Sequence, residues 1–167
     1  MYPRAFHYHR ASSLKEAVTM LSQLGDDAKL LAGGQSLIPL MKLRFANPQH
    51  LVDLNFVPGT SYIKEEGGAL RFGALTRHAE IENSATAAKI PILHDCAAGI
   101  ADVQVRNRGT IGGSLAEADP SGDWAVVLIT LWRSTARPPG WRRRSTGSPG
   151  RWASACSCPP RPNARGW

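Results

Sequence analysis

Residues 30–37 read Leu-Leu-Ala-Gly-Gly-Gln-Ser-Leu, and this stretch decides the fold. Residues 29–31 are expected to form a short strand and residues 37–43 a helix, with Pro39 tolerated in its first turn. The two glycines between them let the backbone turn sharply and approach a ligand closely. Successive N–H groups of such a turn bind an anion such as a pyrophosphate, and Ser36 adds a hydroxyl donor. A lone Gly-Gly-x-Ser pattern is, however, more often an ordinary strand-to-helix turn.

The residues around this turn predict a small α/β unit that covers residues 1–54. Two further strands are expected at residues 5–9 and 50–54. Ser13 and Glu16 match a capping box, in which each side chain satisfies the other's backbone amide at the start of a helix. Gly25 supplies the stop of that helix. The apolar residues that recur at helical spacing between these ends are Leu14, Ala17, Val18, Leu21 and Leu24.

A second unit of mixed helices and strands is expected over residues 55–131, after a Pro-Gly linker at residues 55–60. It is expected to begin with a hairpin of residues 62–64 and 69–72 around the turn 65–68. Two helices are expected next, one capped by Thr76 and running to Asn83 and one at 92–100 after Pro91. A glycine-centred loop at 105–115 and an apolar run at 124–131 follow, and periodicity leaves this run open as helix or strand.

The loop at residues 105–115 contains Thr110-Ile-Gly-Gly-Ser114, which repeats the chemistry of the first glycine turn. Two anion-cradling turns of this kind are suited to hold the phosphates of a dinucleotide between two parts of a fold. The pattern alone leaves open that the second turn is unrelated to the first.

Four segments together resemble one protein family. They are residues 31–44 (Leu-Ala-Gly-Gly-Gln-Ser-Leu-Ile-Pro-Leu-Met-Lys-Leu-Arg), 51–55 (Leu-Val-Asp-Leu-Asn), 72–78 (Phe-Gly-Ala-Leu-Thr-Arg-His) and 105–116 (Val-Arg-Asn-Arg-Gly-Thr-Ile-Gly-Gly-Ser-Leu-Ala). In this order they resemble the medium, FAD-binding subunit of molybdenum hydroxylases, the family of aerobic carbon monoxide dehydrogenase and xanthine dehydrogenase. The resemblance covers residues 1 to about 131.

The resemblance implies an α+β FAD-binding domain of the vanillyl-alcohol-oxidase type, made of two small subdomains with FAD between them and lacking its C-terminal part. It implies no catalytic side chain and no metal ligand in this chain. The residues that match the family's cofactor contacts are Ala32, Gly33, Gly34, Gln35, Ser36, Leu37, Ile100, Thr110, Ile111, Gly112, Gly113, Ser114 and Asp123, with Leu30 and Leu31 as less specific neighbours.

The resemblance also implies two partners and a route for electrons. A large subunit would carry the molybdenum cofactor, and a small subunit would carry [2Fe–2S] clusters. Electrons would pass from those clusters through FAD to an acceptor such as NAD or a quinone, with the flavin supplying the redox chemistry. The basic turn with Arg106 and Arg108 would face either phosphate, the iron–sulfur partner or solvent.

Charge and composition set residues 132–167 apart from the rest. Residues 1–131 contain twelve Lys/Arg and thirteen Asp/Glu, whereas residues 132–167 contain eight Arg and no acid. Because this tail also lacks Leu, Ile, Val and Phe, we expect it to be irregular. A wrong reading frame of a GC-rich gene yields such a composition, so we hypothesise a frameshift. The hypothesis fails if no other frame of the coding sequence restores the family pattern.

Cysteine content and hydropathy indicate the cytoplasm. The three cysteines form no even, spaced framework, the N-terminus has no apolar signal segment, and no apolar run approaches the length of a membrane span. The five histidines show no metal-ligand spacing, so we expect no metal site. His78 is expected to be structural, and Cys96 to be a buried apolar residue.

Two other functions remain as alternatives. One is a relic of the FAD subunit that keeps the motifs but does not hold the cofactor, because missing strands would leave apolar surface exposed. On that ground we expect the chain alone to be unstable or to bind FAD weakly. The other is nucleic-acid binding by Trp141 and the arginines at 142–144. We disfavour it and expect no nucleic-acid partner.

Overall fold

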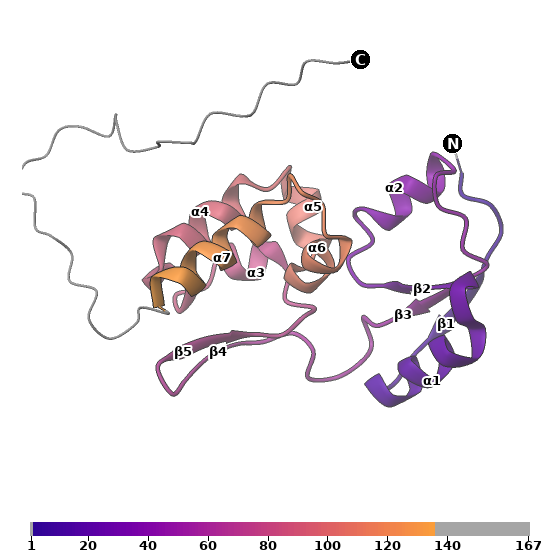
Figure 1. Ribbon diagram of the computed structural model, residues 1–167, viewed down its shortest axis with the longest axis horizontal. Coiled ribbons are helices and arrows are strands. Elements are labelled where there is room, and N and C mark those ends of the chain that lie inside the picture. The colour runs from indigo at the N-terminus through magenta and orange to yellow at the C-terminus, as the bar shows by residue number, and fades with distance from the viewer. Residues whose placement is uncertain (1, 136–167) are drawn as a thin grey trace, which may run out of the picture. The chain divides into compact units, whose positions relative to one another are not determined.

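The computed structural model describes residues 2–135 (Figure 1). In chain order the elements are β1 (His7–Arg10), α1 (Leu14–Leu24), η1 (Gly25–Asp27), β2 (Ala28–Leu31), α2 (Leu37–Lys42), β3 (His50–Asp53), β4 (Ile63–Glu66), β5 (Ala69–Phe72), α3 (His78–Glu82), η2 (Ala87–Lys89), α4 (Pro91–Gly99), α5 (Val103–Arg108), α6 (Ile111–Glu117) and α7 (Asp123–Thr135).

The first three strands form a parallel sheet in the order β1-β3-β2. His50 in the central strand β3 pairs with both His7 and Ala28. At the other end Leu31 pairs with Asp53, and the amide of Leu54 donates to the Leu31 carbonyl at 3.0 Å. The glycine turn that follows β2 therefore begins beside the end of β3, as in other α/β units whose parallel strands end at one edge.

Helix α1 begins as the sequence predicts, but its capping arrangement differs in one half. The Ser13 side chain accepts from the Glu16 amide at 3.2 Å. The Glu16 carboxylate, instead of returning to Ser13, accepts from the amide of Ser12 at 2.8 Å and from its hydroxyl. The helix ends at Gly25 with a φ of 61°, a conformation that glycine adopts without strain. Both predicted ends of this helix are confirmed.

One side of α1 packs on the sheet through a narrower stripe than the apolar spacing predicts. Ala17 is buried together with Val52 of β3, and Leu21 and Leu24 pack against them. Leu14 and Val18 are exposed. Two of the five apolar positions therefore face outward.

The second part consists of a hairpin and a group of helices. The strands β4 and β5 pair antiparallel, Ile63 with Phe72, and the turn between them places Gly67 and Gly68 at φ values of 60° and 74°. Strand β4 extends to Glu66, two residues beyond the prediction. The tight Gly-Gly turn explains the extension, because two central residues at positive φ let the flanking strands pair up to the turn.

The helices α3, α4, α6 and α7 share one apolar core. Its fully buried members include Ile81, Leu93, Ile111 and Trp124, and residues of the hairpin pack against it. Figure 1 shows these helices together with the hairpin. The core thus includes residues of α3 and the first residue of α6, the two helices that border the second glycine turn.

Three expectations for this part are wrong or are resolved. Residues 105–115 are not a loop, because α5 and α6 occupy most of them. Thr76 does not cap α3: its hydroxyl bonds the backbone of Tyr62, and Arg77 stands at the cap position. The undecided run 124–131 lies in α7, which continues to Thr135.

The continuation of α7 corrects the expected start of the irregular tail. Residues 132–135 belong to the helix. The remaining prediction, irregular structure over 136–167, falls outside the described residues, as do the frameshift hypothesis and the nucleic-acid reading of Trp141.

Candidate functional site

The first glycine turn connects the end of β2 to the start of α2. Gly34 has a φ of 73°, which side chains rarely adopt, and a Cβ there would lie 3.1 Å from both Ile38 and Leu31. Gly33 is buried, while Gln35 and Ser36 are exposed. The turn is therefore a tight backbone loop whose last two residues face outward.

This turn leaves its backbone amides available. Within residues 2–135, the amides of residues 33–37 donate no hydrogen bond to the protein. The Gln35 side chain bonds back to the Gly33 carbonyl at 3.3 Å, and the Ser36 hydroxyl does not cap α2. Five successive amides without an acceptor, next to a helix start, suit an anion with several oxygens such as a diphosphate.

The second glycine turn has a different construction. Thr110 precedes α6 and accepts from the Gly113 amide at 3.1 Å. The amides of Ile111 and Gly112 donate to the carbonyls of Thr76 and Ala74, and that of Ser114 donates to Thr110. These amides therefore already have acceptors in the structure, and the expectation that the second turn cradles an anion with its backbone stays a prediction. A ligand there would meet the Ser114 hydroxyl and a surface without side chains.

The structure brings the two turns into contact. A Cβ on Gly33 would lie 2.3 Å from the Arg108 carbonyl oxygen and 2.8 Å from the Cα of Gly109. A Cβ on Gly113 would lie 3.9 Å from the Cβ of Ala32. Residues about eighty positions apart in the chain thus meet backbone to backbone, as the pairing of the two motifs predicts.

A buried histidine supports the second turn from behind. His78 accepts a hydrogen bond from the Trp124 indole at Nδ1, 3.1 Å away, and its Nε2 lies 3.5 Å from the Ser114 hydroxyl. Burial first, and then the charge of Arg77, lower the pKa of His78 to about 4. Because a neutral imidazole that accepts at Nδ1 carries its proton at Nε2, this proton points to Ser114. These contacts agree with the structural role expected for His78.

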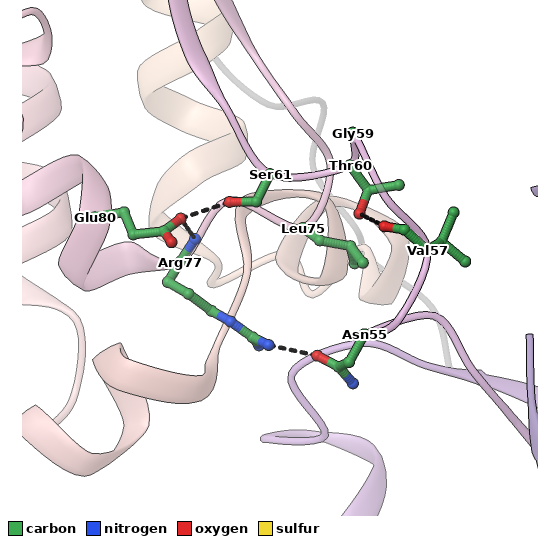
Figure 2. A pocket seen from close by; sticks show the side chains of 8 residues that line it. All are labelled: Asn55, Val57, Gly59, Thr60, Ser61, Leu75, Arg77 and Glu80. Atoms are coloured by element: carbon green, nitrogen blue, oxygen red, sulfur yellow. Dashed lines mark hydrogen bonds between the residues drawn. The ribbon is translucent and has the colours of Figure 1, made fainter. Parts of the chain in front are cut away.

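A polar network that the sequence analysis did not single out links both turns, and Figure 2 shows its central pair, Arg77 and Asn55. The Arg77 guanidinium donates to the Asn55 side chain and to the Arg108 carbonyl. Asn55 donates to the Ala32 carbonyl at 2.8 Å. Two signals mark these residues: Asn55 follows the end of a strand, and Arg77 lies in the Thr-Arg-His segment of the family resemblance.

The carboxylate of Asp53 anchors this network. It accepts from the Tyr8 hydroxyl at 2.6 Å and from the backbone amide of Asn55 at 2.8 Å. Burial opposes ionisation of this carboxyl, but the hydrogen bonds from Tyr8 and Asn55 outweigh it and lower the pKa of Asp53. The Tyr8 hydroxyl, which donates to the carboxylate, has a raised pKa because of that bond.

Arg77 and Asn55 also border a hollow of about 270 Å³. Figure 2 shows the Arg77 side chain reaching toward Asn55, while its backbone amide meets Glu80, which also accepts from Ser61. The hollow is lined by Asn55, Val57, Gly59, Thr60, Ser61, Leu75, Arg77 and Glu80.

The remaining predicted contacts do not gather at the glycine turns. Asp123 is exposed at the start of α7 and lines a separate hollow with Cys96 and Gly99. Ile100, which follows α4, packs against the helical core. Burial, and to a smaller degree the charge of Asp123, raise the pKa of Cys96 to about 11, so this thiol is unreactive at neutral pH.

Three histidines that look scattered in the sequence meet on the sheet. The His9 and His50 rings share a 3.0 Å nitrogen–nitrogen contact, and His7 stacks on His50. No set of three His, Cys, Asp or Glu in residues 2–135 is placed to hold a metal ion. Within the same residues no helix combines the length and apolar character needed to cross a membrane.

Comparison with known proteins identifies the family. Residues 4–132 match the model of the FAD binding domain in molybdopterin dehydrogenase. The carbon monoxide dehydrogenase medium chain of Hydrogenophaga pseudoflava is 49% identical over 132 residues, which are 78% of this chain and 46% of the relative. This chain thus spans about half the length of the curated relatives it matches.

Solved structures agree in fold. A carbon monoxide dehydrogenase from Hydrogenophaga pseudoflava superposes with a TM-score of 0.76 at 50% identity, over 77% of this chain and 45% of that one. Quinoline 2-oxidoreductase from Pseudomonas putida 86 gives 0.75 at 41% identity, over 78% and 46%. The family resemblance and the α+β fold expected from it are confirmed, and the chain belongs to the family of FAD-binding domains of molybdopterin dehydrogenases.

Proposed function

We propose that this chain holds FAD at the adjoining glycine turns and forms the flavin-binding part of a molybdenum hydroxylase. The observation that carries the proposal is the first turn, where the amides of residues 33–37 have no acceptor in the described part of the chain. Two phosphates with several oxygens are the natural ligand for five such donors. The family match supplies the identity of the cofactor.

The first turn would bind the diphosphate. The backbone of Gly33 and Gly34 would approach it closely, and the exposed Gln35 and Ser36 would add side-chain donors. Burial of Gly33 against Arg108 fixes the back of the turn, so its front is the face left for the cofactor. Ala32 and Leu37 would border the cofactor at the two ends of the turn.

The second turn would contribute in another way. Since His78 donates to the Ser114 oxygen, the hydroxyl hydrogen of Ser114 remains free to donate to the cofactor. Gly112 and Gly113 would present a face without side chains, and Thr110 and Ile111 would hold that face in place. Two other proposed contacts, Ile100 and Asp123, would meet parts of the cofactor away from the phosphates.

FAD, when bound, supplies the two-electron chemistry, and the residues of this chain bind and orient it. We propose a molybdenum-cofactor large subunit and a [2Fe–2S] small subunit as partners. Electrons would enter from the small subunit and leave to NAD or a quinone. We further propose two subdomains, 1–54 and 55–131, with the cofactor between them, and a cytoplasmic location.

The test is a comparison of flavins on the purified full-length chain. Binding of FAD, FMN and riboflavin is followed by quenching of flavin fluorescence. Because the proposed donors meet a diphosphate, FAD should bind at least about tenfold more tightly than FMN, the effect of one lost charge-assisted hydrogen bond. Folded protein that takes up no FAD would contradict the proposal and favour the relic alternative. Equal affinity for FAD and riboflavin would contradict the role of the turns.

A further inference from the structure

We infer that Arg77 and Asn55 form a strut between the two glycine turns and act as positioning residues for the FAD site. The inference rests on the proposed function, since it concerns the same site. The strut consists of the Arg77 guanidinium, the Asn55 carboxamide and the two backbone carbonyls they hold, those of Ala32 and Arg108.

The backbone of Arg77 is itself fixed to the second turn. Arg77 pairs with Thr110 in an antiparallel bridge, and the His78 amide donates to the Gly109 carbonyl at 3.1 Å. On the other side the Arg77 amide donates to Glu80 at 2.9 Å, which holds the start of α3. The guanidinium therefore extends from a rigid base that moves with the second turn.

One carbonyl joins the strut to the contact between the turns. The Arg108 oxygen accepts from Arg77, and it is also the atom that a Cβ on Gly33 would meet at 2.3 Å. Gly33 allows the first turn to approach this carbonyl, and Arg77 donates a hydrogen bond to it. The spacing of the turns at this point thus depends on both residues.

The carboxamide of Asn55 has one compatible orientation. Its oxygen faces a guanidinium, which only donates, and its nitrogen faces the Ala32 carbonyl, which only accepts. The side chain of Asp53 holds the Asn55 amide, and Tyr8 in turn holds Asp53. The far end of the strut is therefore anchored in the sheet at the base of the first turn.

Lysine cannot replace arginine in this arrangement. The two acceptors of Arg77, the Asn55 oxygen and the Arg108 carbonyl, are met by two nitrogens of one planar group. A lysine keeps the charge but offers a single point that lacks this fork geometry. The substitution Arg77→Lys therefore removes the forked hydrogen bonds of the strut but keeps the positive charge. It distinguishes a role of Arg77 in the strut from simple attraction of its charge to the phosphates.

The experiment is a double-mutant cycle on FAD affinity with the full-length chain. Arg77→Lys and Asn55→Ala should each raise the FAD dissociation constant about tenfold, as for loss of one charge-assisted hydrogen bond. The double variant should have a FAD dissociation constant no higher than that of the more affected single variant, because either change breaks the same connection. Arg71→Lys, at an exposed arginine paired with Glu66 in the hairpin, is the matched control and should change affinity less than about twofold.

If the increases in dissociation constant of the two single variants multiply in the double variant, the two residues act independently and the strut is overturned. A loss of FAD affinity in Arg71→Lys equal to that in Arg77→Lys would also overturn it. Hydrogen exchange of flavin-free protein supplies a second measurement. Both single variants should raise exchange of the amides at residues 111–114, whereas unchanged exchange in both overturns the strut without reference to FAD. If the wild-type chain takes up no FAD, the proposed function fails, and the exchange result alone decides the strut.

Discussion

Gly33 is the residue on which the contact between the two turns depends. A Cβ on this residue would meet backbone atoms of Arg108 and Gly109, which cannot rotate away as a side-chain end can. Five glycines of residues 2–135 have a positive φ. Gly33 is not one of them, and it is needed for the space that a Cβ would take. The family motif therefore has a steric reason here that the sequence pattern does not reveal.

Substitution Gly33→Ala should force the turns apart. We expect a loss of about 1–3 kcal/mol in the free energy of unfolding, the usual cost of overpacking, and at least tenfold weaker FAD binding. Urea unfolding and flavin titration measure the two effects. Gly99→Ala is the control: a Cβ there meets nothing within 4 Å at the end of α4, so stability should hold or rise by up to about 1 kcal/mol. A Gly33→Ala variant indistinguishable from Gly99→Ala would refute the steric argument.

His78 makes the stability of the chain depend on pH. Its pKa is lowered from 6.5 to about 4 by burial and by Arg77, so the unfolded chain takes up a proton before the folded chain does. This contribution is therefore fully present above pH 6.5 and is lost as the pH falls from 6.5 to 4. Its size follows from the shift and is on the order of 3 kcal/mol.

Urea unfolding at several pH values between 4.5 and 7 tests this prediction. The substitution His78→Gln keeps a donor and an acceptor but does not titrate, so it should remove most of the pH dependence in this range. His94→Gln, at an exposed histidine beside Asp95, should leave the dependence as in the wild type. If the pH dependence of the free energy of unfolding in His78→Gln equals that of the wild type, the dependence arises from carboxylates and not from His78.

At the scale of single elements, α6 depends on its cap. It is a helix of seven residues whose second and third positions are glycines, the weakest helix formers except proline. Thr110 compensates by accepting a hydrogen bond from the Gly113 amide. The contact of Gly112 with the Ala74 carbonyl holds the N-terminal end of helix α6 in place. Tertiary contacts, and not intrinsic propensity, therefore form this helix.

Removal of the cap by Thr110→Ala should cost about 0.5–2 kcal/mol of stability. Thr110→Ser keeps the hydroxyl and should cost less than half as much. Thermal unfolding followed by circular dichroism compares the two variants. Equal losses would mean that the buried methyl group of Thr110, and not its hydroxyl, stabilises this end of α6.

The same tertiary contacts explain which elements the sequence could predict. Helix α1 and the hairpin carry local signals, a Ser cap with a Gly stop and a Gly-Gly turn, and both lie close to their predicted ranges. Helices α5 and α6 also have capping residues, Asp102 and Thr110, but both helices are short, and the glycines at 109, 112 and 113 favoured the prediction of a loop. The cap assigned to Thr76 was wrong because its hydroxyl is used by the backbone of Tyr62, a contact that no local pattern encodes.

The candidate site shows the same division. The meeting of the two glycine turns agrees with the repeated motif, although the repeat alone left open that the second turn is unrelated to the first. The occupied amides of the second turn do not follow, because their acceptors, Ala74 and Thr76, belong to another part of the chain. The link through Arg77 and Asn55 likewise exists only after the sheet and α3 have been brought together.

For the molecule as a whole, the outer side of α7 carries exposed apolar side chains near the helical core. Val126 and Ile129 lie one turn apart on this helix and are 62% and 56% exposed. Ile92 of α4, which shares a hollow with Val126, is exposed as well. Exposed apolar side chains that lie this near one another favour association of soluble proteins.

We therefore expect the chain to self-associate through this surface and charged substitutions to suppress it. Val126→Glu combined with Ile129→Glu should lower the mass measured by light scattering at high protein concentration, while stability changes by less than about 0.5 kcal/mol. Val127→Glu, one position along the same helix, is the contrasting variant: Val127 packs against the helical core, so a carboxylate there should unfold the protein. If the double variant associates as strongly as the wild type, the contact surface lies elsewhere, and if it unfolds like Val127→Glu, the outer side of α7 contributes to the core after all.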